Sequence, residues 1–121
     1  MEATTPIENE SDRRPAADVL FRVVVGKLDD IPAGQGRAYV VGGRTIAVFR
    51  QRDGRVFATD NQCPHRGGPL AEGIVGDGKV ICPLHAWKID LASGRCLGEN
   101  AAVCTHPVEV IGGEIVVTVA A

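Results

Sequence analysis

The sequence has few aromatic residues, no long apolar run and no strong excess of either charge. Of its 121 residues 4% are aromatic and 45% are apolar, and the formal net charge is −2. The apolar fraction suffices for a core, and the length favours one compact domain. The charge gives no electrostatic attraction for nucleic acid. No apolar stretch approaches the roughly 20 residues that span a bilayer, so neither a nucleic-acid partner nor a membrane partner is predicted.

Targeting features are also missing from the first 17 residues. They contain no apolar stretch of the kind a signal peptide needs, and they carry acidic residues, which transit sequences avoid. We therefore expect residues 1–17 to form a disordered polar tail and residues 18–121 to form the domain. Without an export signal, a cytoplasmic location is expected, where thiols stay reduced and cysteines more often bind metal.

Motifs for catalysis are missing as well. The chain has no Gly-rich phosphate-binding loop, no nucleotide fingerprint and no arrangement of a nucleophile beside a base. No catalytic residue is therefore predicted.

The chain instead consists largely of short apolar runs separated by turn residues. The dipeptides Gly-Gly at 42–43, Asp-Gly at 77–78 and Gly-Gly at 112–113 suit two-residue hairpin turns. No helical periodicity is sustained, so an all-β fold is expected, as a small barrel or as stacked antiparallel sheets. The predicted strands are 19–25, 37–41, 44–50, 55–59, 74–76, 79–82, 87–91, 108–111 and 114–119, with one helical turn at 28–31.

Two segments carry residues suited to binding a metal. Cys63 and His65 form a C-x-H motif, and Cys82 and His85 form a C-x-x-H motif, with residues 66–81 between the two. Each segment offers one thiolate and one imidazole from a short turn stiffened by proline. The hairpin predicted at 77–78 returns the second segment beside the first. The four side chains are therefore predicted to bind a metal centre between two loops.

A ligand set of two cysteines and two histidines also binds structural zinc. Zinc fingers and ribbons usually pair C-x-x-C with H-x-x-x-H or with a second C-x-x-C, whereas each segment here is mixed. A mixed pair in each loop allows both cysteines to bind one iron and both histidines to bind the other, as Rieske ligation requires. We favour the iron–sulfur interpretation and keep a structural zinc-binding module as a remote alternative.

On these motifs the chain resembles the Rieske 2Fe–2S family from about residue 19 to residue 119. The resemblance implies an antiparallel β base domain that carries a small cluster-binding subdomain, here about residues 61–91, with one cluster per chain. It implies that Cys63 and Cys82 bind the inner iron, while His65 and His85 bind the outer iron. The implied function is one-electron transfer, as the electron-transfer subunit of an oxidoreductase without a substrate site of its own.

The resemblance also implies a low reduction potential. High-potential members carry a disulfide between the two loops and Ser and Tyr hydroxyls directed at the cluster. Gly68 and Leu84 occupy the disulfide positions here, and Trp87 and Ile89 occupy the positions of the hydroxyls. The chain therefore resembles the ferredoxin-like branch.

Within that branch, segments 27–32, 46–49, 67–73 and 91–94 are most similar to the small subunit of NAD(P)H-dependent assimilatory nitrite reductase. That similarity implies a large sirohaem flavoprotein as the partner. The alternative is the Rieske ferredoxin of an aromatic-ring-hydroxylating dioxygenase system, whose partner would be a dioxygenase component.

Three further residues could suggest a second metal site. Cys104 and His106 repeat the C-x-H spacing, and Cys96 is their nearest additional cysteine. The segment lacks a glycine loop and a second mixed pair, so structural roles are expected for all three. Trp87 is expected to pack in the core.

Overall fold

The computed structural model describes residues 20–64, 67–84 and 86–120. The predicted tail at 1–17 lies outside these residues, as do His65 and His85. In the part described, the regular elements are β-strands and two short 3-10 turns, so the prediction of an all-β fold is confirmed. The strands are β1 (Leu20–Lys27), β2 (Gln35–Val41), β3 (Arg44–Arg50), β4 (Val56–Asp60), β5 (Ile74–Gly76), β6 (Lys79–Ile81), β7 (Lys88–Asp90), β8 (Thr105–His106), β9 (Val108–Ile111) and β10 (Glu114–Ala120); the 3-10 turns are η3 (Leu28–Asp30) and η4 (Leu70–Glu72).

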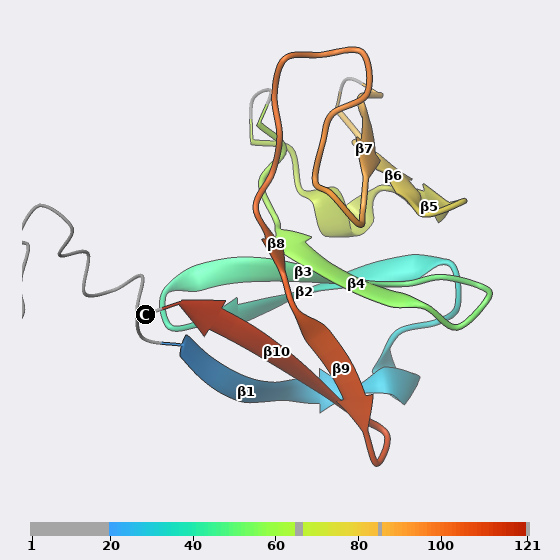
Figure 1. The fold of residues 1–121 in the computed structure, drawn as a ribbon. Coiled ribbons are helices and arrows are strands. Elements are labelled where there is room, and N and C mark those ends of the chain that lie inside the picture. Colours follow the sequence, from blue (N-terminus) through green and yellow to red (C-terminus); the bar gives the residue numbers. More distant parts are fainter. Residues whose placement is uncertain (1–19, 65–66, 85, 121) are drawn as a thin grey trace, which may run out of the picture.

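Two antiparallel sheets form the base of the molecule. One has the strand order β1-β10-β9 and the other the order β2-β3-β4-β8. They lie in the lower half of Figure 1, with β1, β9 and β10 below β2, β3 and β4. Their facing side chains, Ile46, Val48, Ile115 and Val117 among them, are fully buried in one apolar core. β1 and β10, the first and last strands of the described chain, pair with each other, so both ends of the described chain lie in one sheet.

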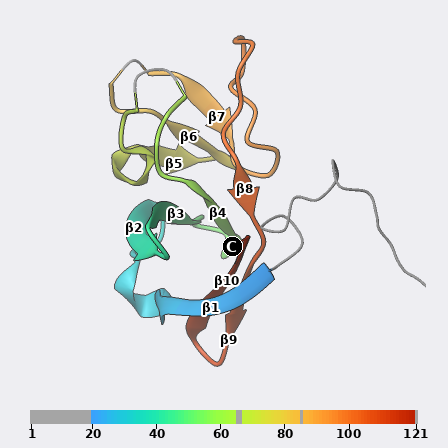
Figure 2. The same cartoon turned by 90° about the vertical axis from the view of Figure 1, so that its left-hand side faces the viewer.

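A third sheet, β5-β6-β7, lies above the base in both views (Figures 1 and 2). It has its own apolar core, which also takes in η4 and part of the segment between β7 and β8. Strand β3 contributes to both cores, because Ile46 and Val48 face the base while Ala47 and Phe49 face the upper part. Successive side chains of a strand point to opposite faces, so the unbroken apolar run at 46–49 indicates a strand that is buried on both sides.

Each end of the nine predicted strands lies within two residues of the observed end. At the predicted hairpin at 77–78, Asp77 and Gly78 have φ of 52° and 72°, and Gly42 and Gly43 have φ of 57° and 85°. Two successive positive φ values match the twist of the flanking strands in a two-residue turn. Strand β8 was not predicted, because its two polar residues show no apolar alternation. No helix among the described residues is long and apolar enough to cross a membrane.

Candidate metal centre

The first predicted ligand loop is closed by two backbone hydrogen bonds. The N–H of Cys63 donates to the carbonyl of Gly68 over 2.8 Å, and the N–H of Gly67 donates to the carbonyl of Cys63 over 2.8 Å. Gly67 has φ of +70°, a left-handed conformation that glycine adopts without steric cost. His65 belongs to this loop by sequence but lies outside the described residues.

The second loop repeats this pattern of hydrogen bonds. The N–H of Cys82 donates to the carbonyl of Trp87 over 2.8 Å, and the N–H of Ala86 donates to the carbonyl of Cys82 over 3.0 Å. In both loops the cysteine thus bonds the residues four and five positions later. The two loops are structurally equivalent at their described residues, which the sequence spacing alone does not show. His85 is the remaining predicted ligand, and it too lies outside the described residues.

The structure brings the two predicted cysteines into the same apolar core. Cys63 and Cys82 are each 2% exposed, and they pack with Leu70, Val80 and Ile89. A Cβ added at Gly68 would lie 2.9 Å from the Sγ of Cys82. The first loop therefore lies directly against the sulfur of the second, with no room between them for a side chain.

These features fit a metal–sulfur group. Two thiols that are removed from water, each at the start of a closed loop, offer soft ligands in a low-dielectric setting. Backbone approaches the sulfur of Cys82 where Gly68 has no side chain. The residues present are therefore compatible with an iron–sulfur cluster.

Asn61 holds the first loop against the base. Its N–H donates to the carbonyl of Thr45 over 3.0 Å, and its own carbonyl accepts the N–H of Leu70 over 2.7 Å. Its side-chain Oδ1 accepts the N–H of Ala71 over 2.9 Å. One residue therefore ties β3, the loop and η4 together, which fixes the position from which Cys63 projects. The sequence analysis did not single out Asn61.

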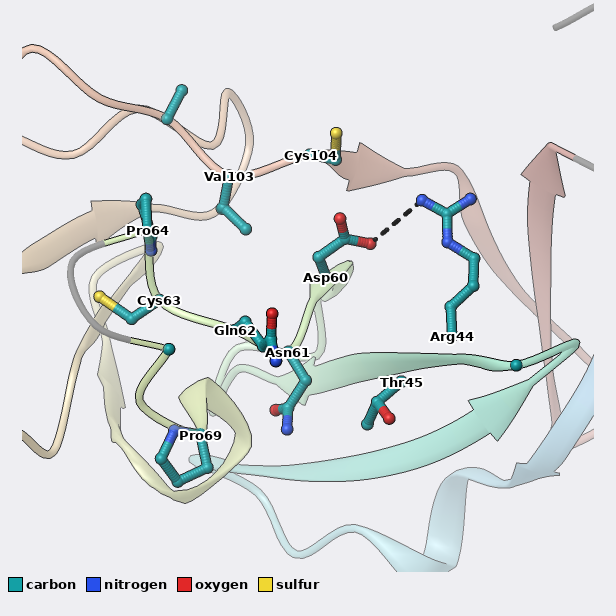
Figure 3. A pocket seen from close by; sticks show the side chains of 13 residues that line it. Arg44, Thr45, Asp60, Asn61, Gln62, Cys63, Pro64, Pro69, Val103 and Cys104 are labelled. Carbon is teal, nitrogen blue, oxygen red and sulfur yellow. Dashed lines mark hydrogen bonds and ion pairs between the residues drawn. The ribbon is translucent and has the colours of Figure 1, made fainter.

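A groove of about 840 Å³ lies beside the first loop (Figure 3). Arg44 and Asp60 line this groove and form an ion pair at 3.5 Å, and the side chain of Cys63 points away from this pair. The Nε2 of His106 lies 2.8 Å from the Oδ1 of Asp60, and its side chain is only 8% exposed. Because Asp60 ends β4 and His106 ends β8, this contact joins the two chain segments that connect the base to the upper part. His106 thus has a structural role.

The other two cysteines are thiols in different surroundings. Cys96 is buried in the same core as Cys82, and burial raises the pKa of its thiol, with smaller contributions from Glu99 and Cys82. Cys104 is exposed. Within the described residues no group of three His, Cys, Asp or Glu side chains could hold a metal ion, so Cys96, Cys104 and His106 form no second site. Trp87 packs against the core as predicted.

Ala86 allows a direct test of loop strain. It is a non-glycine residue with φ of +59°, at the position equivalent to Gly67 in the first loop. A left-handed conformation costs an L-residue about 1–2 kcal/mol, while glycine costs about 0.5–1 kcal/mol in lost chain entropy. We expect Ala86→Gly to stabilise the folded protein by up to about 1 kcal/mol, measured as a higher temperature of loss of visible absorption. Gly67→Ala should lower that temperature. If Ala86→Gly lowered the temperature and Gly67→Ala raised it, the two loops would not be equivalent.

Comparisons with known proteins identify the family to which the chain belongs. The profile of the Rieske [2Fe–2S] domain matches residues 21–111. The anthranilate 1,2-dioxygenase ferredoxin subunit of Burkholderia cepacia is 36% identical over 97 residues, which cover 78% of this chain and 89% of that protein. The ferredoxin of carbazole 1,9a-dioxygenase from Nocardioides aromaticivorans has 32% identity and a TM-score of 0.71, covering 79% of this chain and 95% of that one.

A second kind of relative appears among the solved structures. A Mycobacterium tuberculosis chain assigned as an NADH-dependent nitrite reductase small subunit has 29% identity and a TM-score of 0.79. The match covers 86% of this chain and 99% of that one. The profile match spans most of the chain and includes both ligand loops. The chain is therefore an electron-transfer component of oxidoreductase systems and belongs to the Rieske [2Fe–2S] domain family.

Proposed function

We propose that Cys63, His65, Cys82 and His85 hold one 2Fe–2S cluster per chain. The two closed loops and the buried thiols of Cys63 and Cys82 support this ligand set. When bound, a Rieske cluster supplies one-electron oxidation and reduction, at about −150 to +300 mV across the family. We place the domain at residues 18–121 and its cluster-binding part at about 61–91.

The chain's own residues would set the surroundings of that cluster. Leu70, Val80 and Ile89 exclude water from the side of the thiols that faces the core. Ile89 is fully buried and carries no hydroxyl, and Gly68 lies against Leu84, where a Cβ would meet the leucine Cγ at 3.1 Å. Because Gly68 and Leu84 cannot form a disulfide and Ile89 offers no hydroxyl donor, we propose a potential in the low part of the family range.

The outer surface of the loops would meet the redox partner. Pro64, Gly67 and Ala86 are exposed, and Leu84 is 54% exposed. Where the loop surface is formed by these four residues, a partner can approach closely without the cost of removing water from charged groups. Rapid one-electron exchange depends on such close contact.

We infer that the partner is the large sirohaem flavoprotein of an NAD(P)H-dependent assimilatory nitrite reductase, with this chain as the small subunit in the cytoplasm. The observation that carries this proposal is the TM-score of 0.79 over 99% of the small subunit from M. tuberculosis. The dioxygenase ferredoxin from N. aromaticivorans matches at 0.71 over 95% of its length. Reduction of nitrite would take place on the larger subunit.

A second candidate function is the ferredoxin component of an aromatic-ring-hydroxylating dioxygenase system. The identity of 36% to the anthranilate dioxygenase ferredoxin favours it, because this is higher than the 29% identity to the M. tuberculosis chain. The two candidates share the cluster and the one-electron chemistry. They differ in the partner that receives the electron.

Co-purification separates the candidates. We expect the tagged holoprotein, isolated from nitrate-grown cells, to bring down a sirohaem flavoprotein, and we expect its addition to that flavoprotein to increase NAD(P)H-dependent nitrite reduction. Recovery of a dioxygenase component instead would assign the second function. Colourless native protein with about one zinc and no acid-labile sulfide per chain would overturn the cluster itself and leave a structural zinc module.

A further inference from the structure

An apolar groove of about 710 Å³ lies in the base, between β1 and β2. Val23, Val25, Tyr39 and Val41 line it and also pack against the core of the base. Phe21, Val24 and Val40 line it too and are exposed, Val40 at 76%. Clustered exposure of large apolar side chains is typical of binding surfaces. The groove therefore has both an apolar floor and an apolar rim.

The two strands that border the groove are both edge strands. β1 is the first strand of the order β1-β10-β9, and β2 is the first of the order β2-β3-β4-β8. In an antiparallel sheet the outer side of an edge strand presents backbone N–H and C=O groups that no neighbouring strand pairs. A segment lying between β1 and β2 can therefore form backbone hydrogen bonds to an edge strand, as in recognition by β-strand addition.

Tyr39 supplies a polar group without a partner in the same place. Its hydroxyl oxygen is buried and has no hydrogen-bond partner among the described residues. The ring packs against Gly26 of β1, where an added Cβ would lie 3.0 Å from the ring. Burial raises the pKa of Tyr39, with Arg37 opposing the effect, so the hydroxyl stays protonated and can donate. A buried donor without an acceptor costs about 1–3 kcal/mol, which a bound acceptor would recover.

The charges around the groove restrict what can bind there. β1 and β2 carry Arg22, Lys27 and Arg37 and no acidic residue. Arg44 is the one charged side chain that lines the groove in the described part of the chain. Arg22 and Arg44 are paired with Glu109 and Asp60, whereas Arg37 lies over the Tyr39 ring at 5.9 Å. A second copy pairing through the same strands would bring the remaining strand cations, Lys27 and Arg37, near their own copies, so a segment with acidic ends fits better.

The chain's own first residues match the charge but not the apolar lining. Residues 1–19 include four acidic residues before Arg13, namely Glu2, Glu8, Glu10 and Asp12, but Ile7 and Val19 are their only branched aliphatic residues. A groove lined by valines and a phenylalanine gains most from apolar residues at every second position. A segment of another protein meets this requirement better than the tail does.

We propose that this groove binds an extended segment of the redox partner as an added β-strand, with apolar residues alternating along it and acidic residues at its ends. The inference rests on the proposed function in that it requires a larger partner protein. β1 lies on the side of the base away from the β5-β6-β7 sheet in both views (Figures 1 and 2). The segment would thus hold the partner while the ligand loops remain accessible for electron transfer.

A labelled peptide tests the groove without the partner. We expect the full-length holoprotein to bind fluorescein-labelled EVTVTVE, measured by fluorescence anisotropy, at least tenfold more tightly than KVTVTVK. Val40→Glu removes apolar contact and repels the acidic ends, so it should weaken binding of the acidic peptide about tenfold or more. Ile74→Glu is the matched control, because Ile74 is 71% exposed on β5, outside the groove, and it should bind like the wild type.

Several results would overturn the proposal. These are equal affinity for the two peptides, absence of binding, or loss of binding in the Ile74→Glu control. A concentration-dependent dimer that Val40→Glu abolishes would assign the groove to a second copy. Peptide binding that appears only in the Glu8→Gln, Glu10→Gln, Asp12→Asn variant would assign it to the tail. Peptide binding as expected without co-purification of a flavoprotein would reject the proposed partner but leave the groove in place.

Discussion

Replacing Cys82 with serine is expected to leave the protein without its cluster. The proposed ligand is a buried thiol, and a serine hydroxyl is a harder and much weaker ligand for iron–sulfur chemistry. The neighbouring Gly68 leaves no space for the loop to bring another side chain to the same point, since even a Cβ would lie 2.9 Å from the sulfur. Native protein should contain about two iron and two acid-labile sulfide per chain, and the variant almost none.

Cys104→Ser is the matched control for this experiment. It makes the same chemical change at an exposed cysteine outside the two ligand loops, so iron and sulfide should remain at the native level. Cys63→Ser should behave like Cys82→Ser. If Cys82→Ser kept a full complement of iron and sulfide, the ligand set would be wrong, and Cys96 would be the first residue to test because it is buried in the same core.

Local sequence patterns predicted the strands well because each depends on a few neighbouring residues. The three hairpin turns follow from pairs such as Asp77-Gly78, whose positive φ values only a few residue types tolerate at low cost. The two loops were singled out because each pairs a cysteine with a histidine in a short turn, which suits a shared metal centre. Their matching hydrogen bonds were not predicted, since the carbonyls that close the loops belong to residues as different as Gly68 and Trp87.

Features that depend on contacts between distant segments could not be predicted. Strand β8 forms because Thr105 and His106 pair with Thr59 and Ala58, a contact between positions more than 40 residues apart with no apolar pattern. The groove between β1 and β2 is likewise a property of two sheets. Its valines look like ordinary strand residues in the sequence, and only the strand order shows that both edges are open.

Replacing Gly73 with alanine is expected to have the second large effect, through packing alone. An added Cβ would lie 2.3 Å from the carbonyl oxygen of Ile81 and 2.8 Å from the Cγ2 of Val80. Backbone cannot give way there without moving β6, and Ile81 is the residue directly before Cys82. Overpacking of this kind costs about 3 kcal/mol, so the temperature of cluster loss should fall by more than about 10 °C.

Gly76→Ala is the internal control, because it adds the same methyl group in the same hairpin. A Cβ at Gly76 meets nothing within 4 Å, so the change should alter stability by less than about 0.5 kcal/mol. A second expectation concerns the site: the displaced β6 should separate Cys82 from Gly68, so the Gly73→Ala protein should lose its visible absorption faster than the wild type at a temperature where both remain folded. Equal rates of loss in the two proteins would show that the position of Cys82 does not depend on the packing of Gly73.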